Sequence, residues 1–482
     1  MQGCHRPAMK LSPRFGQVRA VRAAALVVLA SCAAESPSRT QRILESLSDD
    51  NLIAGRREPA LVALKLRKMQ RGPYEWLRGT ASLYWRDLME PGVERAETTF
   101  GDPASSRVLL VGDPHPENVG TFRGFSDGQM FVDWNDFDAT GYGPFTGDLR
   151  RLAAAFVVIA ELGKPGDGGF AAELSKHVAA GYAEQIAVIA AGDRVASLGV
   201  GVAALFDDEL AKAQARGDTL FAVDELAPLQ QDVRALALGD LESVADDGVI
   251  EDRVIDVDAE QADWIDRAIA QWAPGRLTPT EATIKLRARR IGSGVSSYPA
   301  FRFQAVLEGA TPALDDDRLI ELKETREGII VRGVPILQGA EWATPAERAV
   351  DTQVRLHARF DGDALLGAAQ VGGLSFKIRD REAYQRGLDA PDLSELAVDD
   401  PDQLRVIAKR YGMLLGRAHA QALTADRLRG VTVIAPLLAG RETELADEIA
   451  TLAAADAAQV IADHALMKDR DLASLLDLGA SR

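Results

Sequence analysis

Two short segments of the chain carry a high density of oxygen-bearing side chains. Gly112-Asp113-Pro114-His115-Pro116-Glu117-Asn118 follows the apolar run 108–111, and Asp133-Trp134-Asn135-Asp136-Phe137-Asp138 follows Met130-Phe131-Val132. An apolar run that ends in Asp, Asn or Gly predicts a strand entering a tight loop. Phosphoryl transfer from a nucleotide needs a hydroxyl that is held and deprotonated, and Mg²⁺ that bridges the phosphates and takes oxygen ligands. One aspartate base, one asparagine ligand and one aspartate ligand on neighbouring strand ends meet that need.

Two other interpretations compete with this one. Asp, Asn, Gly and Pro are also the residues of ordinary turns, so either segment alone is a weak signal. A calcium-binding EF-hand at 133–144 is excluded, because that loop requires glycine at its sixth position and glutamate at its twelfth, where Asp138 and Pro144 stand. The two segments together favour a phosphotransfer site.

These motifs, with Asp148-Leu149-X-X-Leu152, resemble the aminoglycoside and choline kinase branch of the protein-kinase-like superfamily. The resemblance implies that Asp113 is the catalytic base and that Asn118 and Asp133 bind the metal. It implies ATP and Mg²⁺ as cofactors. The residues with implied supporting roles are His115, Asp136 and Asp148, the last as structural support of the catalytic loop.

The candidates for nucleotide binding come later in the chain. Gly292-X-Gly294-X-X-Ser297 lies between two predicted strands, as a glycine-rich loop should, although it lacks a third glycine. Lys323 lies in the strand after next, where a kinase lysine would contact the α- and β-phosphates. Its partner would be an acid on the following helix. Glu347 and Asp351 both qualify, and Asp351 is favoured because Glu347 can close a capping box with Thr344.

The order of these motifs differs from that of an ordinary kinase, in which the glycine-rich loop and the lysine precede the catalytic loop. The segment 411–419 resembles the helix that comes before the catalytic loop in aminoglycoside-type kinases, with His419 as a packed or hydrogen-bonded residue of that helix. A circular permutation explains the order, since domain termini often lie close together. The arrangement over roughly 60–425 resembles an uncharacterised bacterial family, domain of unknown function 2252. Arg78 and Arg151 are candidates to orient phosphates or acids, or to form structural ion pairs.

The elements that position these residues are those of an α+β protein. The predicted fold is a circularly permuted, two-lobed, protein-kinase-like fold with a mostly helical large lobe and a small antiparallel sheet lobe. Strands are expected near 108–111, 130–132, 284–291, 301–308, 319–324, 328–336 and 373–379, and helices over 148–162, 170–190 and from 344 onward. The N-terminal part is expected to be a leader over 1–32 and a tether over 33–50. The large lobe is expected to consist of its catalytic-loop part over 51–282 and of helices that complete it over 381–482, with the small lobe between them over 283–380. Within the catalytic-loop part, the stretch 192–256 is expected to be helical.

Composition limits the partners and the compartment. The chain has a net charge of −17, which argues against nucleic acid or an anionic membrane surface as a default partner. Residues 1–32 instead contain five basic side chains and no acid, followed by a short apolar run that ends in Leu29-Ala30-Ser31-Cys32. This pattern predicts an export signal, and it resembles the bacterial lipoprotein box in which the cysteine, here Cys32, is lipidated. A membrane-anchored or periplasmic lipoprotein is therefore expected, with a cytoplasmic protein that starts at Met9 as the alternative.

Three functions are compatible with the sequence. The first is an ATP- and Mg²⁺-dependent phosphotransferase that acts on a small-molecule or protein hydroxyl, with nucleotidyl transfer as a close variant. The second is a non-catalytic lipoprotein of the same fold that binds a nucleotide or another ligand. The third is an interaction protein, which no positive feature of the sequence supports. The intact acid and amide set favours the first, and the leader favours the second, because ATP is scarce outside the cytoplasm.

Overall fold

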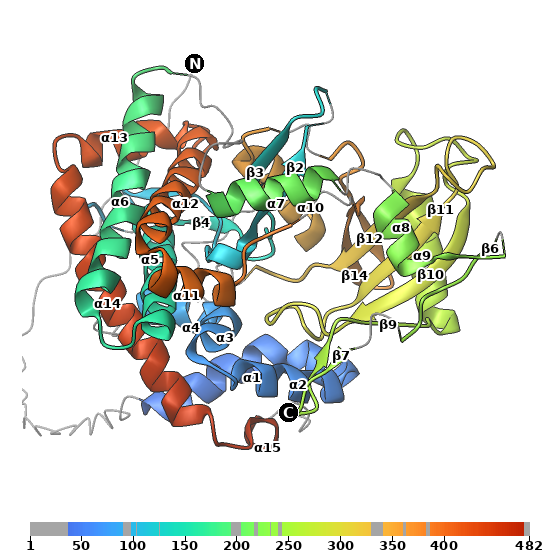
Figure 1. The fold of residues 1–482 in the computed structure, drawn as a ribbon, viewed down its shortest axis with the longest axis horizontal. Coiled ribbons are helices and arrows are strands. Elements are labelled where there is room, and N and C mark those ends of the chain that lie inside the picture. Colours follow the sequence, from blue (N-terminus) through green and yellow to red (C-terminus); the bar gives the residue numbers. More distant parts are fainter. Residues whose placement is uncertain are drawn as a thin grey trace, which may run out of the picture. The chain divides into compact units, whose positions relative to one another are not determined.

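The computed structural model describes residues 37–89, 98–102, 104–124, 126–193, 204–215, 220–231, 233–239, 243–328, 341–359, 363–381 and 386–476. Contacts within the chain separate a first unit, Met1–Ser38, from a second, Arg39–Arg482. All the elements named below belong to the second unit, which is an α+β structure (Figure 1). No helix in the described ranges is both long and apolar enough to cross a membrane.

The helices and strands have the following bounds. The helices are α1 (Arg39–Arg57), α2 (Pro59–Met69), α3 (Pro73–Gly79), α4 (Ala81–Met89), η1 (Pro116–Asn118), α5 (Phe145–Gly163), α6 (Gly168–Ala190), α7 (Ala204–Ala215), α8 (Leu220–Leu226), α9 (Ala259–Trp272), α10 (Pro345–Leu356), α11 (Ala390–Asp399), α12 (Pro401–Gln421), α13 (Gly430–Leu438), α14 (Glu442–Met467) and α15 (Leu472–Leu475). The strands are β1 (Arg107–Leu110), β2 (Val119–Arg123), β3 (Met130–Trp134), β4 (Gly141–Pro144), β5 (Leu229–Gln230), β6 (Val233–Arg234), β7 (Ser243–Val244), β8 (Ile250–Glu251), β9 (Arg253–Ile255), β10 (Ile284–Ile291), β11 (Arg302–Leu307), β12 (Arg318–Glu324), β13 (Gly367–Val371) and β14 (Leu374–Asp380).

Helices α5, α6, α12 and α14 share the largest hydrophobic core (Figure 1). Helices α6 and α12 approach closely at glycines that face the neighbouring backbone. A Cβ on Gly181 would lie 2.0 Å from the carbonyl oxygen of Lys409, and one on Gly412 would lie 1.9 Å from that of Val178. The glycines therefore let α12, near the end of the chain, pack directly against helices that follow the first acidic segment.

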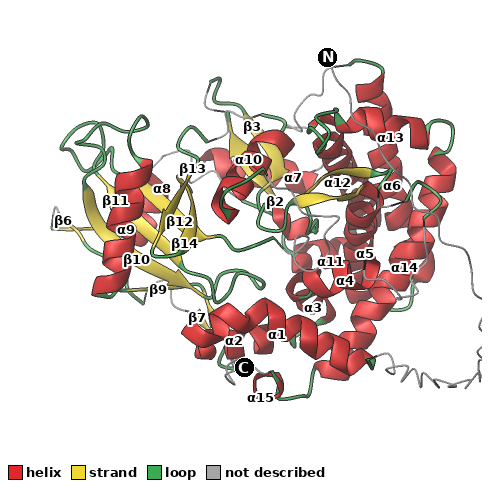
Figure 2. Ribbon diagram, turned by 180° about the vertical axis from the view of Figure 1, so that it is seen from behind, coloured by secondary structure: helices red, strands yellow, loops and turns green. Residues whose placement is uncertain are grey.

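Within the described residues, six strands form an antiparallel sheet in the order β13-β14-β12-β11-β10-β9 (Figure 2). One face of this sheet is apolar, because hydrophobic residues alternate along its central strands. Leu322, Phe303 and Ile378 are fully buried on that face, in a cluster that includes Trp272 of α9. The intervening side chains, such as Lys323, therefore point to the opposite face.

Two short hairpin-like pairs carry the acidic segments. Strand β1 pairs antiparallel with β4, and β2 pairs antiparallel with β3. The first acidic segment, 112–118, leaves β1 and leads through η1 into β2, and the second, 135–138, follows β3 directly. Both segments therefore follow strands, as the sequence predicts.

The structure corrects several expectations from the sequence, and one expected strand lies outside the described residues. The expected tether over 33–50 is helical from Arg39 onward, because Ile43, Leu47 and Ala54 repeat at helical spacing and are buried beside α2 and α15. The stretch 192–256 is not helical throughout, since it forms the short strands β5 to β9 after α8. Strand β13 was not anticipated, and the strand expected at 328–336 lies almost wholly outside the described residues.

Candidate active site

A cavity of about 340 Å³ lies where the two acidic segments meet the polar face of the six-stranded sheet. Its lining also includes the loop 293–297, which joins β10 to β11. Charged side chains dominate the lining, and seven are basic and five acidic. The basic residues are Arg78, Arg302, Lys323, Lys377, Arg379, Arg381 and Arg386, and the acidic residues are Asp113, Glu117, Asp136, Asp138 and Glu321. The lining thus has an excess of positive charge in a chain whose net charge is −17.

The loop that carries Asp113 is held in place by Asp148 of α5. The buried carboxylate of Asp148 accepts hydrogen bonds from the backbone N–H groups of Val111 (2.8 Å) and Gly112 (3.1 Å). His419 Nε2 lies 3.1 Å from Asp148 Oδ2, and the other ring nitrogen lies 3.0 Å from the hydroxyl of Tyr182. Asp148 is therefore placed to support the loop, as the sequence predicts, and His419 is a hydrogen-bonded residue of α12.

Asp113 is 8% exposed and lines the cavity. Its Oδ1 atom accepts from Arg151, whose Nε and Nη2 atoms lie 2.7 Å and 2.6 Å away. Burial raises the pKa of Asp113 while Arg151 opposes that rise. Because Arg151 engages only Oδ1, Oδ2 is left for a ligand in the cavity, and the Nε2 atom of His115 lies 3.9 Å from it.

His115 lies on the same loop and is 3% exposed. Burial, followed by the nearby Arg78 and Arg151, lowers the pKa of His115 well below its usual value, so the ring is neutral at pH 7. Its Nδ1 atom is buried and has no hydrogen-bond partner in the part of the chain that the structure describes. This nitrogen is therefore an unpartnered polar atom of a residue that lines the cavity.

Asn118 and Asp136 supply oxygen atoms to the cavity. The Nδ2 atom of Asn118 donates to the backbone carbonyl of Asp113 (2.9 Å), which leaves the side-chain oxygen of Asn118 for a ligand. Asp136 Oδ2 lies 2.9 Å from the amine of Lys323. Although burial alone would raise it, Lys323 holds the pKa of Asp136 well below its usual range, so Asp136 is a carboxylate at pH 7.

Asp133, the acid expected beside Asn118, does not line the cavity. It lies within β3, opposite Gly120, and it is fully buried. Its Oδ1 forms an ion pair with Arg417 of α12, and its Oδ2 accepts from the backbone N–H of Ala358 (2.8 Å). The strand continues for one residue beyond Asp133, so the chain turns into the cavity only at 135, and Asp136 takes the position that the sequence analysis gave to Asp133.

Lys323 faces the cavity from near the C-terminal end of β12. Its amine lies 2.9 Å from Asp136 and 2.6 Å from Asp138. Burial alone would lower its pKa, but these two carboxylates raise it above the usual value. The expected partner Asp351 lies elsewhere, because it accepts from Trp342 Nε1 (2.6 Å) and pairs with Arg355 (2.7 Å) on its own helix, α10.

The helix cap at Glu347, which led us to favour Asp351 as the partner of Lys323, is present. The backbone N–H of Glu347 donates to Thr344 Oγ1 (3.1 Å), and the Glu347 carboxylate accepts from the N–H of Ala343 (3.0 Å). The helix α10 therefore begins as the sequence predicts. The partner of Lys323 could not be found by that reasoning, because it comes from the second acidic segment, almost two hundred residues earlier.

Both glycines of the predicted glycine-rich loop have left-handed backbone conformations. Gly292 has φ +85°, and a Cβ there would lie 2.6 Å from the backbone nitrogen of Asp252 and the carbonyl oxygen of Ile250. Gly294 has φ +73° and lines the cavity, whereas Gly292 does not. Gly292 therefore positions the loop, and Gly294 is the glycine placed to approach a ligand.

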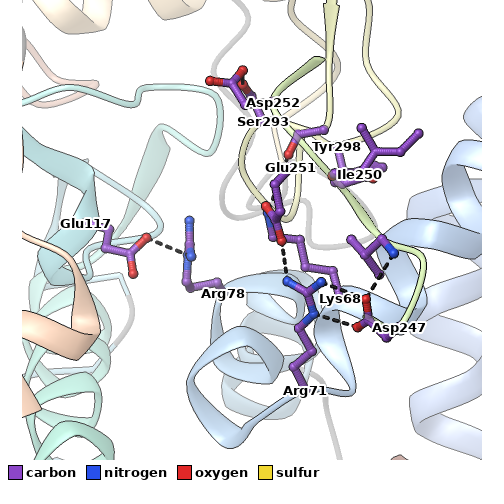
Figure 3. A network of polar contacts seen from close by, with 12 residues as sticks. Lys68, Arg71, Arg78, Glu117, Asp247, Ile250, Glu251, Asp252, Ser293 and Tyr298 are labelled. Atoms are coloured by element: carbon purple, nitrogen blue, oxygen red, sulfur yellow. Dashed lines mark hydrogen bonds and ion pairs between the residues drawn. The ribbon is translucent and has the colours of Figure 1, made fainter. Parts of the chain in front are cut away.

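Figure 3 shows how the N-terminal helices hold this loop. Lys68 of α2 pairs with Glu251 of β8. Arg71 pairs with Asp247 (2.7 Å) and also with Glu251, and Ser293 donates to Asp252 (2.9 Å). These contacts connect the segment 247–252, to which the sequence assigned no role, with the base of the glycine-containing loop.

Arg78 of α3 contacts both sides of the cavity. Its guanidinium pairs with Glu117 of the Asp113 loop (2.7 Å), as Figure 3 shows. Its backbone carbonyl accepts from the hydroxyl of Ser296 (2.6 Å), which belongs to the glycine-containing loop. Arg78 therefore fixes the Asp113 loop and the glycine-containing loop to the same helix.

A family model described as "Uncharacterized protein conserved in bacteria (DUF2252)" matches residues 57–470. The chain belongs to this family. No curated protein and no solved structure matches it. The matched range contains every cavity residue named above.

Sequence reasoning missed a set of cations that this DUF2252 protein carries on the sheet side of the cavity. Lys377, Arg379 and Arg381 alternate along β14 and just beyond it, and each lines the cavity. The alternation with buried Phe376 and Ile378 is visible in the sequence and indicates a strand with one basic face. That signal was available, but it was used only to predict the strand.

A protein-only metal centre is not preformed in the DUF2252 cavity. Among the described residues, no group of three or more His, Cys, Asp or Glu side chains could hold a metal ion. Mg²⁺ is commonly held by one or two protein oxygens together with substrate phosphates and waters. Asn118 and Asp136 fit that mode of binding, since both line a cavity that is rich in lysine and arginine side chains.

Proposed function

We propose that this DUF2252 protein is an ATP- and Mg²⁺-dependent phosphotransferase that acts on a hydroxyl acceptor. The observation that supports it best is that one cavity is lined by Asp113, Asn118 and Asp136 and also by Gly294 and Lys323. These are a base, two oxygen ligands, a loop glycine and a lysine, which are the parts that phosphoryl transfer requires. They come from distant parts of the sequence, so chance turn chemistry would not gather them.

In the proposed reaction, Asp113 Oδ2 accepts the proton of the acceptor hydroxyl. The hydroxyl oxygen then forms a bond to the γ-phosphorus, the bond from that phosphorus to the bridging oxygen breaks, and ADP leaves. Arg151 keeps the Asp113 carboxylate oriented through Oδ1. Bound Mg²⁺, held by Asn118 and Asp136, would neutralise phosphate charge. Lys323 would move from Asp136 and Asp138 to the phosphates when the nucleotide enters.

We also propose that the fold is protein-kinase-like in circularly permuted order. The sheet supports this, because a glycine loop follows β10, the lysine lies on β12 and α10 is the next element that the structure describes. The helix α12 supports it as well. Although α12 lies near the end of the chain, it contacts the Asp113 loop through Tyr411, which donates to the carbonyl of Pro116 (3.0 Å). It also reaches Asp148 through His419. A helix that would precede the catalytic loop in the unpermuted order thus packs against that loop.

The first test is nucleotide binding by the purified protein, followed by thermal unfolding in ATP with and without Mg²⁺. A ligand that binds only the folded state raises stability, by about 2.7 kcal/mol at a concentration a hundred times its Kd. Wild type should show an Mg²⁺-dependent rise in melting temperature, and Lys323→Ala should show a much smaller one. If no nucleotide shifts the wild-type transition, the phosphotransferase proposal is wrong.

We further propose that the protein is exported and anchored through a lipid on Cys32. The proposal rests on the leader sequence, and residues 1–36 lie outside those that the structure describes. An exported protein would meet little ATP, so a binding protein without catalysis is the alternative that this compartment favours. Transfer of labelled γ-phosphate by purified protein separates the two functions, because the alternative binds the nucleotide and transfers nothing.

A further inference from the structure

The side of the cavity that the six-stranded sheet forms, called the sheet wall below, is charged, whereas most ligand pockets are lined mainly by apolar side chains. In the register of the sheet, Arg302 of β11 lies opposite Lys323 of β12, and Lys323 lies opposite Lys377 of β14. Like charges that face one another across strands are unfavourable. Three neighbouring cations therefore need counter-charges, supplied by the protein or by a ligand.

The protein supplies counter-charges to only part of this wall. Glu321, 1% exposed, lies 2.7 Å from Arg379 and 3.3 Å from Arg302, and it is shared between them. Lys323 is paired with Asp136 and Asp138.

Lys377 differs from these neighbours. Its side chain is 5% exposed, and its amine forms no ion pair or hydrogen bond with any described residue. The amine lies over the ring of Phe137, 5.3 Å from the ring centroid. Burial, then Arg379 and Lys323, lowers the pKa of Lys377 to about 8, so at pH 7 most of the population still carries the charge. Asp136 and Asp138 attract the ammonium without forming an ion pair with it. A buried ammonium without a close partner is costly, and an anion in the cavity would remove the cost.

We propose that Lys377, Arg379 and Arg381 form a phosphate subsite that extends along β14 beyond Lys323. Alternate residues of a strand are about 6.6 Å apart, so the three positions span about 13 Å, enough for an extended polyphosphate or for two separate phosphate groups. The subsite deepens the proposed phosphotransferase function and rests on it, because Lys377 lies next to the lysine assigned to the reacting nucleotide. Its ligand chemistry is a phosphate group, and the group could belong to the nucleotide's own phosphate chain or to the acceptor.

The test uses inorganic pyrophosphate as the probe, titrated into the full chain without Mg²⁺ and followed by calorimetry. We expect wild type to bind it and Lys377→Gln to bind it about 10- to 100-fold more weakly, the range for losing a hydrogen bond to a charged group. Arg381→Gln should weaken binding in the same direction. Lys409→Gln is the matched control, since Lys409 is a partly exposed lysine of α12 that pairs with Glu184 and does not line the cavity, and it should bind like wild type.

A second readout shows whether a weakened variant is merely misfolded. Because the Lys377 amine forms no ion pair with any described residue, Lys377→Gln without ligand should unfold at or above the wild-type temperature. Unaltered pyrophosphate affinity in Lys377→Gln overturns the subsite, and so does weakened affinity that is accompanied by a lower unfolding temperature. The phosphotransferase proposal is judged separately by Mg²⁺·ATP, so each proposal can fail alone.

Competition identifies the source of the phosphate. If Mg²⁺·ATP displaces pyrophosphate, the subsite holds the nucleotide's own phosphate chain. Label on the α-phosphate, rather than on the γ-phosphate, would then be transferred if the nucleotide binds in the reversed direction. In that case the acceptor oxygen bonds to the α-phosphorus, pyrophosphate leaves and the proton goes to Asp113. If Mg²⁺·ATP and pyrophosphate bind together, the subsite belongs to an acceptor that carries a phosphate group.

Discussion

The assignment of the second metal-binding oxygen to Asp136 rather than Asp133 predicts opposite behaviour for two single substitutions. Asp133→Asn removes the only carboxylate that pairs with Arg417 in the described residues. Arg417 is 1% exposed, and its Nε and Nη1 atoms already have no hydrogen-bond partner there. Removal of one partner of a buried ion pair costs about 3–5 kcal/mol, a large share of a typical stability of about 5–15 kcal/mol. Asp133→Asn should therefore strongly destabilise the ligand-free protein.

Asp136→Asn should act mainly on the ligand. Lys323 keeps its ion pair with Asp138 at 2.6 Å, so the loss of Asp136 should cost only about 1–3 kcal/mol. The folded-state pKa of Asp136 lies below its unfolded value, so its stabilising effect is fully present at pH 7 and is lost only as the pH falls below about 4. The Mg²⁺-dependent part of the stabilisation by ATP should largely disappear, because a neutral amide replaces a carboxylate ligand.

The assay is urea unfolding of each ligand-free variant at pH 7, followed by thermal unfolding in ATP with and without Mg²⁺. Asp402→Asn, at a side chain that is 92% exposed, is the control and should be within about 0.5 kcal/mol of wild type. The reasoning is refuted if Asp133→Asn has nearly wild-type stability but has lost the Mg²⁺-dependent shift, since Asp133 would then be the ligand and its pairing with Arg417 unimportant.

Three further predictions test other parts of the structure. Gly292→Ala should lower the free energy of unfolding in urea clearly more than Gly166→Ala. Both glycines have positive φ, but only at Gly292 would the new Cβ meet backbone atoms, so equal losses would contradict the close approach at Gly292. Burial and then Asp380 raise the pKa of Asp363 to about 7, so the contribution of Asp363 to the free energy of unfolding should fall as the pH rises from about 4 to 7. Asp363→Asn should therefore flatten the dependence of the free energy of unfolding on pH, by a few kcal/mol at most. Wild type should fractionate with membranes and Cys32→Ala should not, and a wild-type protein found in the cytosol without lipid would sink the anchor.

The sequence located most of the cavity but not its exact ligands. Asp113, Asn118, Gly294 and Lys323 were all identified beforehand, and all four line the cavity. They could be identified because each depends on a local pattern, such as an apolar run followed by Asp or a Gly-X-Gly between strands. The pairing of Lys323 depends instead on which loop the fold brings opposite β12. No local pattern contains that information, so the expected partner, Asp351, was wrong.

The burial of Asp133 and the unexpected helix α1 have a common physical origin. The end of a strand or helix is set by its tertiary partners, and sequence patterns place it only within a few residues. Strand β3 extends through Trp134 because it pairs with β2, which turns Asp133 into the interior. Helix α1 begins at Arg39 where that side chain pairs with Asp87 and Asp463. Both partners lie outside any window that a local pattern could include.

The contacts of Arg78 assign a role to the N-terminal helices, for which the motifs gave none. The carbonyl of Arg78 accepts from Ser296 of the glycine-containing loop, while its guanidinium pairs with Glu117 of the Asp113 loop. A single residue of α3 thus sets the spacing between the loop assigned to the phosphates and the loop assigned to the base. Because productive transfer requires reacting atoms to be held within a few tenths of an ångström, the spacing matters more to catalysis than to nucleotide binding. Removal of the guanidinium should therefore lower turnover more than it lowers nucleotide affinity, which is the behaviour of a positioning residue and not of a phosphate ligand.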